Sequence, residues 1–324
     1  MMKRSLNRCV TTRPSAKKRK SLLLVVVQLT FVSLLFTFFS LVITTAHVGA
    51  ACSCQDQLAP LSEFYNATDG PVSWANKWDL TSTSAPCGFY GVTCDDAAGA
   101  ITSIVLVSNN LRGSLPKSLS LLGSLFQVFV VNNNAISGTL PDSYHNWTNM
   151  MNFSVKSNLF TGPLPSSYSL WQAITSFNVG TTNISGTLPL AYGTSTGWCT
   201  SLNIFAIQNC AGINGTLPPE YGNWSNLGVM NAEGTGLSGP IPAEYAQWRH
   251  IDTISFTNVL GVGNLSGTIS AKLSSGWVNL TQLSLRGNKF TGSLPHGVAP
   301  GEVIWPKMRN FVLAQNQFGG TLPV

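Results

Sequence analysis

The sequence predicts a solenoid, a stack of short β-coils, and two observations carry that prediction. The tetrapeptide Gly-x-Leu/Ile-Pro recurs nine times at spacings of 24 to 29 residues, with Ser270 replacing the Pro in the seventh copy. Apolar residues stand at matching offsets before each glycine. Repeats of this length are typical of solenoids, in which each coil packs only against its neighbours. The nine glycines are Gly113, Gly138, Gly162, Gly186, Gly215, Gly239, Gly267, Gly292 and Gly320.

Each coil is expected to begin with a short β-strand. Ile104 and Leu106 lie two residues apart in the first copy, as Phe129 and Val131 do in the second, so both members of each pair point to one side of a strand. The strands of successive coils can then pair in a parallel sheet along the concave face. Nine strands at ~4.8 Å give a face about 40 Å long.

The residues after the strand are expected to carry the chain to the convex side. An Asn follows the strand in most copies, and its side-chain amide can satisfy backbone groups that leave the sheet. Thr182, Cys210 and Thr235 replace this Asn in copies four to six. Gly then permits a positive φ that is unfavourable for other residues. Leu-Pro starts the extended segment, here called the return, that leads along the convex side to the next strand. We therefore expect a mostly β fold with an irregular or 3-10 convex side.

The pattern L-x-x-L-x-L-x-x-N-x-L is that of a leucine-rich repeat, and the form x-L-x-G-x-L/I-P resembles plant-type leucine-rich repeats. The segment "LSEFYNATDGPVSWANKWDLTSTSAPCGFYGVTC" resembles the N-terminal cap of those ectodomains. That resemblance implies a disulfide between Cys87 and Cys94, closing a loop around Tyr90, Gly91 and Val92. It divides the chain into a cap at residues 51–100 and nine repeats at residues 101–324, the last incomplete.

The convex returns carry Tyr and Trp three residues apart, as in "LPDSYHNW". Such returns are similar to those of the promastigote surface antigen family of kinetoplastid protists, and this resemblance implies a glycosylated surface protein with a recognition or adhesion role. The Tyr and Trp columns could be a sugar-binding platform or part of the core. Leu273 replaces the Tyr in one copy, which a core position tolerates. We therefore predict that these rings face inward.

The N-terminus predicts membrane targeting. Residues 1–20 hold eight of the 18 Lys and Arg, and residues 21–46 form a hydrophobic stretch long enough to span a bilayer. This stretch is either an uncleaved signal-anchor, with residues 1–20 in the cytosol, or a signal peptide cleaved after Ala50. The repeats are then extracellular on a single-pass plasma-membrane protein, or secreted. Beyond Ala50, ten basic and twelve acidic residues leave a net charge of −2, which argues against nucleic acid as a partner.

Cysteines and glycosylation motifs agree with an extracellular location. Six cysteines follow residue 50, an even number that suggests disulfides. The pairing of Cys52, Cys54, Cys199 and Cys210 stays open: Cys52 and Cys54 favour a structural bridge over metal ligation, and Cys199 and Cys210 form either a bridge or two buried thiols. Eight N-x-Ser/Thr motifs are predicted to carry glycans, mostly outside the concave strands: Asn66, Asn146, Asn152, Asn183, Asn214, Asn223, Asn264 and Asn279.

The sequence favours recognition over catalysis. It contains no phosphate loop, nucleophile elbow or Cys/His metal cluster, so we expect no enzyme, cofactor or metal site. The concave face is the predicted site for an extracellular protein or glycan ligand. Two alternatives keep the same fold, namely a secreted inhibitor of extracellular hydrolases and the truncated ectodomain of a receptor. The candidate contact residues are Lys156, Asn178, Asn231, Glu233 and Arg286.

Overall fold

The computed structural model describes residues 54–258, 264–295 and 304–320, and residues 51–324 form a compact unit of their own. The predicted cytosolic segment, the hydrophobic stretch at 21–46 and Cys52 lie outside the described residues. Within the three described ranges, no helix has both the length and the apolar character needed to cross a membrane. The two insertions around residues 259–263 and 296–303 also lie outside them.

The N-terminal cap consists of one main helix and an antiparallel pair of strands. The 3-10 helix η1 (Gln55–Gln57) leads into α1 (Leu58–Ala67), which is followed by α2 (Gly70–Ser73). Strand β1 (Val92–Asp95) then pairs with β2 (Ala100–Val105). Helix α1 buries Leu61 and Phe64 completely, and Phe64 meets the Trp74 ring edge-on at 5.7 Å. The cap therefore covers the apolar end of the first coil, as a solenoid requires.

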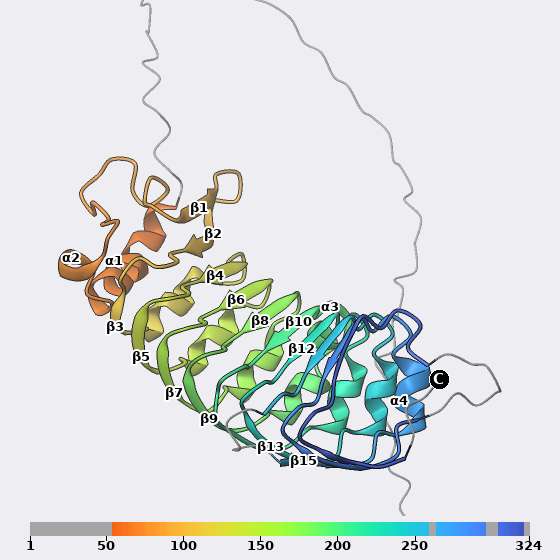
Figure 1. The fold of residues 1–324 in the computed structure, drawn as a ribbon. Helices are drawn as coiled ribbons and strands as arrows, with labels where there is room; N and C mark the ends of the chain where they lie inside the picture. Colours follow the sequence, from red (N-terminus) through yellow and green to blue (C-terminus); the bar gives the residue numbers. More distant parts are fainter. Residues whose placement is uncertain (1–53, 259–263, 296–303, 321–324) are drawn as a thin grey trace, which may run out of the picture. The chain divides into compact units, whose positions relative to one another are not determined.

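The predicted concave sheet is confirmed, and β1 extends it to ten strands in the order β1-β2-β4-β6-β8-β10-β12-β14-β16-β18 (Figure 1). All pairs after the first are parallel and keep the repeat register, so Phe153 lies beside Phe129 on one side and Phe177 on the other. The further strands are β4 (Val128–Val130), β6 (Asn152–Ser154), β8 (Ser176–Asn178), β10 (Ile204–Ala206), β12 (Val229–Asn231), β14 (Thr253–Ser255), β16 (Gln282–Ser284) and β18 (Asn310–Val312).

A second parallel sheet of nine strands lies along the opposite side of the coils and was not predicted (Figure 1). Eight of the nine repeat glycines lie in its strands, and all nine have φ values between 76° and 90°. A glycine with positive φ is ordinarily evidence for a turn, which is why the sequence suggested an irregular return. The strands are β3 (Arg112–Ser114), β5 (Ala135–Thr139), β7 (Leu159–Gly162), β9 (Asn183–Thr187), β11 (Gly212–Thr216), β13 (Gly236–Gly239), β15 (Asn264–Gly267), β17 (Lys289–Gly292) and β19 (Gln317–Phe318).

The returns contain short helices, mostly of the 3-10 type that the sequence predicted. Each starts directly after the Pro of the repeat, with two exceptions. Ser270 caps α4 by accepting a hydrogen bond from Lys272 N, and α3 begins at Thr196, within the extra residues before Trp198. The helices are η2 (Lys117–Leu122), η3 (Asp142–Asn146), η4 (Ser166–Leu170), η5 (Leu190–Gly193), α3 (Thr196–Ser201), η6 (Pro219–Asn223), η7 (Ala243–Gln247) and α4 (Ala271–Gly276).

The Tyr and Trp rings of the returns form the core, as predicted. Tyr168 and Trp171 are completely buried and stack with 4.1 Å between ring centroids. Tyr168 Oη donates to Pro141 O at 3.0 Å, and Trp171 Nε1 donates to Tyr144 O at 3.0 Å. Both acceptors belong to the preceding coil. Tyr221 and Trp224 repeat this arrangement, so these aromatic pairs join coils and are closed to any ligand.

The inward Asn of the repeat satisfies backbone groups as predicted. Asn158 is buried; its Nδ2 donates to Val131 O and Val155 O, both at 2.9 Å, and its Oδ1 accepts from Ile136 N at 3.0 Å. Thr182, the Asn equivalent in the next coil, bonds to Val179 O at 2.8 Å and to Cys210 Sγ of the following coil at 3.3 Å. Asn therefore bonds to the backbone of two coils, whereas the Thr hydroxyl bonds to the backbone of its own coil alone.

Candidate ligand-binding face and cap disulfide

The concave face is the solvent side of the ten-stranded sheet, where outward side chains alternate with the buried Phe and Leu positions. Asn178 ends β8 and Asn231 ends β12, while Lys156, Glu233 and Arg286 each lie two residues beyond their strands β6, β12 and β16. Arg286 is exposed, and the other four are half-buried. The structure therefore places all five predicted residues on this face but spreads them over several coils.

Three carboxamides on the concave face have their oxygen atoms already engaged. Asn178 Oδ1 accepts from Gly180 N at 3.0 Å, and Asn231 Oδ1 accepts from Glu233 N at 3.2 Å. Asn132 Oδ1 accepts from Ser154 Oγ at 2.7 Å. Within the described ranges, the Nδ2 groups of these residues donate to no protein atom. Each residue consequently offers its two Nδ2 hydrogen-bond donors to a ligand, while its oxygen atom has one acceptor site already occupied.

Two further features mark the concave face. Val105 and Val107 are each 40% exposed, and Val130 pairs with Val105, so the end next to the cap is apolar. Gln208 lies over Gly180, where an added Cβ would stand 2.3 Å from Gln208 Cδ. Its Oε1 is buried without a hydrogen-bond partner in the described part of the chain. The alternation of the strand positions signalled the valines, but no pattern signalled the Gly180–Gln208 pair.

The second sheet has a different outer surface. Thr139 packs its methyl group toward Gly162 of the next coil, where an added Cβ would stand 2.9 Å from Cγ2, and Thr187 does the same toward Gly215 at 3.1 Å. Three glycosylation motifs lie on its strands, at Asn183, Asn214 and Asn264, all exposed. The sequence predicted these three motifs outside the concave strands, and the structure places them there, in a second sheet. Their position leaves the concave face with one motif in a strand, the half-buried Asn152.

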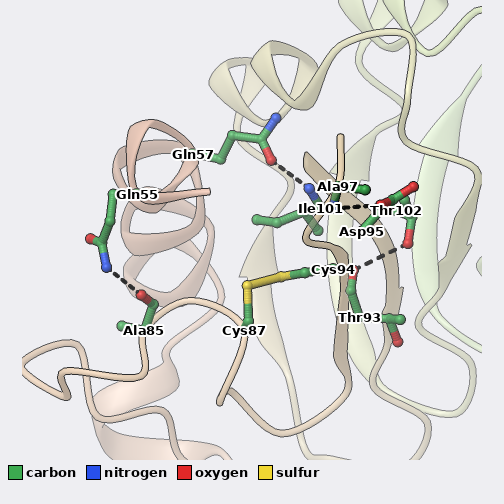
Figure 2. The surroundings of a disulfide bond; sticks show 10 residues. All are labelled: Gln55, Gln57, Ala85, Cys87, Thr93, Cys94, Asp95, Ala97, Ile101 and Thr102. Carbon is green, nitrogen blue, oxygen red and sulfur yellow. Dashed lines mark hydrogen bonds between the residues drawn. A yellow bond between two sulfur atoms is a disulfide. The ribbon is translucent and has the colours of Figure 1, made fainter. Parts of the chain in front are cut away.

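The cap contains the predicted disulfide between Cys87 and Cys94 (Figure 2). The implied role of Tyr90 in the core is wrong: its side chain is 52% exposed, and Phe89 is buried in its place. Phe89 stacks on Trp78 with 4.8 Å between centroids. Tyr90 immediately precedes Gly91, which has a φ of 76°.

Cys54 is a buried free thiol beside that disulfide. The sulfur atoms of Cys54, Cys87 and Cys94 all lie within 4.8 Å of one another. Burial, followed by the negative charges of Asp96 and Asp95, raises the pKa of Cys54. The structural bridge favoured for Cys54 is therefore not formed among the described residues.

Cys199 and Cys210 are two buried thiols, one of the two arrangements that the sequence left open. Cys199 Sγ donates to Gly193 O at 3.4 Å, and Cys210 Sγ donates to Val179 O at 3.3 Å. Cys210 takes the position of the inward Asn and, like Asn158, reaches a carbonyl of the preceding coil. Burial raises its pKa, which keeps the thiol protonated as a donor.

These features define a leucine-rich-repeat solenoid with an open concave face. A family profile described as Leucine Rich Repeat matches residues 279–300. Receptor like protein 27 from Arabidopsis thaliana is 34% identical over 120 residues, which are 36% of this chain and 14% of that protein. A probable inactive receptor kinase from the same plant is 29% identical, over 36% of this chain and 19% of that protein. The chain therefore spans less than a fifth of these relatives, and the matches support leucine-rich repeats similar to those of plant receptors.

Solved structures show the same fold. A TDR receptor matches with a TM-score of 0.61 and 27% identity, over 68% of this chain and 35% of that one. The plant peptide hormone receptor RGFR1 in complex with RGF2 matches with a TM-score of 0.60 and 25% identity, over 68% and 33%. A plant ice-binding protein matches over 84% of this chain and 90% of its own, with a TM-score of 0.60, but at 18% identity it shows the fold alone.

Proposed function

We propose that this chain is a non-enzymatic extracellular recognition protein that binds a peptide or protein ligand on its concave face. The observation that carries the proposal is the set of outward amide donors at Asn132, Asn178 and Asn231, whose oxygen atoms are engaged internally. The carbonyl groups of an extended peptide are acceptors that such donors can bind. The similarity to plant receptors, one of them solved with a peptide hormone, supports a ligand of this class.

Charge and packing also support the concave face as the ligand-binding site. Lys156 and Arg286 are its cations and Glu233 its anion, so steering by charge is weak and hydrogen bonds must supply specificity. The apolar end at Val105 and Val107 would receive an apolar side chain of the ligand. In contrast, the aromatic pairs of the returns are buried, and the second sheet carries three predicted glycan sites.

We place the protein at the cell surface, anchored through residues 21–46 with its repeats outside, because the Tyr/Trp returns resemble promastigote surface antigens and eight glycosylation motifs follow the hydrophobic stretch. Retention in the membrane pellet after an alkaline carbonate wash is the expected result. Release of a chain that begins at Ala51 would favour a secreted inhibitor or a soluble ectodomain.

The test of ligand binding is an array of secreted peptides, proteins and glycans probed with the full chain. Asn178→Ala and Asn231→Ala each remove one donor, and a lost hydrogen bond costs about 0.5–1.5 kcal/mol, or roughly 2- to 12-fold in Kd. Thr187→Ala and Thr216→Ala on the second sheet are the matched controls and should leave Kd unchanged. Loss of binding in the controls with unchanged Kd in the Asn variants would refute the concave site, and a glycan-only hit would refute the ligand class.

A further inference from the structure

The cap brings a third sulfur to its disulfide, and two glutamines hold it there. Cys54 is completely buried, and its Sγ lies within 4.8 Å of the Sγ atoms of both Cys87 and Cys94. Gln55 Nε2 donates to Ala85 O at 2.6 Å, two residues before Cys87. Gln57 Oε1 accepts from Ile101 N at 2.6 Å, and Ile101 pairs with Cys94 across β1 and β2. The segment that carries Cys54 is thus fixed to the neighbours of both bonded cysteines (Figure 2).

This arrangement satisfies the spatial requirement of thiol–disulfide exchange. A thiolate attacks a disulfide sulfur directly, and a third sulfur a few ångströms away needs only a side-chain rotation of about 2–3 Å to reach bonding distance. Cys54 is buried and Cys87 and Cys94 are half-buried, so the three sulfur atoms can react within the cap, and solvent is needed only to exchange the proton. A buried thiol with no disulfide nearby, such as Cys210, lacks this possibility.

We propose that Cys54 exchanges with the Cys87–Cys94 disulfide, so that the folded cap exists in more than one disulfide isomer. In the step, Cys54 loses its proton to solvent and its Sγ forms a bond to one bonded sulfur, either Cys87 or Cys94. The original S–S bond breaks, its electron pair stays on the departing sulfur, and that sulfur takes up a proton. One disulfide and one thiol are present before and after, so no oxidant or reductant is consumed.

The exchange changes what the disulfide holds together. The Cys87–Cys94 bond closes a loop within the cap, with seven residues of sequence separation. A bond from Cys54 instead ties the segment before α1 to that loop or to β1. The cap could therefore link its N-terminal segment covalently, or release it, without a change in the number of disulfides.

Trypsin distinguishes the isomers. It cleaves after Lys77, which lies between Cys54 and Cys87, and next after Arg112. The Cys87–Cys94 bond gives a loop within peptide 78–112, whereas either exchanged bond joins that peptide to the one that ends at Lys77. The full chain with Cys52→Ser is incubated with a trace of reduced glutathione, quenched with acid and N-ethylmaleimide, and digested. Chymotryptic cleavage after Phe89 then shows which sulfur has paired.

We expect the joined peptide pair to appear beside the 78–112 loop and to vanish in Cys54→Ser, which should keep the loop. In Cys94→Ser or Cys87→Ser, oxidised glutathione should drive the remaining cysteine to bond with Cys54. The parent chain is the full chain with Cys52→Ser. The proposal is overturned if, at every incubation time, all Cys54 in the parent chain is recovered alkylated and the 78–112 loop is intact. The parent chain decides this even if a cysteine variant fails to fold.

Discussion

Replacing Asn158 by Ala tests the inward Asn as the link between coils. The side chain satisfies two carbonyl groups and one N–H, all buried: Val131 O and Val155 O at 2.9 Å and Ile136 N at 3.0 Å. Each buried backbone group left without a partner costs about 1–3 kcal/mol. Allowing for partial relaxation and water entry, we expect Asn158→Ala to lower the free energy of unfolding by about 3–5 kcal/mol.

The measurement is urea unfolding of residues 51–324, with Asn149→Ala as the control because Asn149 is exposed in the same coil. Asn158→Thr should cost less than Asn158→Ala, since Thr182 shows that a hydroxyl can still satisfy the carbonyl three residues before it. Asn158→Asp should cost at least as much as Ala, because a carboxylate cannot donate to the two carbonyls. A cost for Asn158→Ala below about 1 kcal/mol, equal to that of the control, would refute the reasoning.

Three further predictions follow from the packing and the buried ionisable groups. Gly162→Ala should destabilise the fold by about 1–3 kcal/mol, because Gly162 has a φ of 76° and an added Cβ would stand 2.9 Å from Thr139 Cγ2; Gly319→Ala, where an added Cβ meets nothing within 4 Å, should be neutral in the same urea assay. Burial raises the pKa of Tyr144, Tyr168, Tyr192, Tyr221 and Tyr245 well above 10.0; the folded state therefore keeps these protons longer than the unfolded chain, and stability should fall as pH rises above 10.0, with tyrosinate absorbance from these five residues appearing only on unfolding. Gradual ionisation of all five in a chain that stays folded by circular dichroism would contradict their burial. The raised pKa of Cys54 predicts slow alkylation at pH 7 that accelerates about tenfold per pH unit, because only the thiolate reacts; a pH-independent rate would contradict a buried, protonated thiol.

The sequence predicted the parts of the fold that depend on one repeat position at a time. The alternation at Ile104 and Leu106, the inward Asn and the aromatic returns each have a local chemical reason, and the structure confirms all three. The second sheet was missed because its strands contain the very glycines that indicate a turn. The strands of that sheet pair because Gly162 and its equivalents each pack on the preceding coil. The sequence of a single repeat does not show this contact between coils.

The candidate site was less predictable for a related reason. The repeat pattern specified which side chains face outward, and Asn178 and Asn231 do so. It could not specify that their oxygen atoms are taken by the N–H groups of Gly180 and Glu233, because that depends on side-chain rotation. The proximity of Cys54 to Cys87 and Cys94 likewise depends on how α1 folds back across the cap, over a separation of more than 30 residues.

The aromatic pairs also give the coil stack a direction. Tyr168 donates to Pro141 O, Trp171 to Tyr144 O, and Asn158 to Val131 O, so in each case the acceptor lies in the coil nearer the N-terminus. For these side-chain donors, a newly made coil finds its acceptors already in place, whereas backbone groups such as Val131 N and Ile136 N find their acceptors, Ser154 O and Asn158 Oδ1, only in the coil that follows. Synthesis from the cap onward matches this order of dependence, and each completed coil serves as the template for the next.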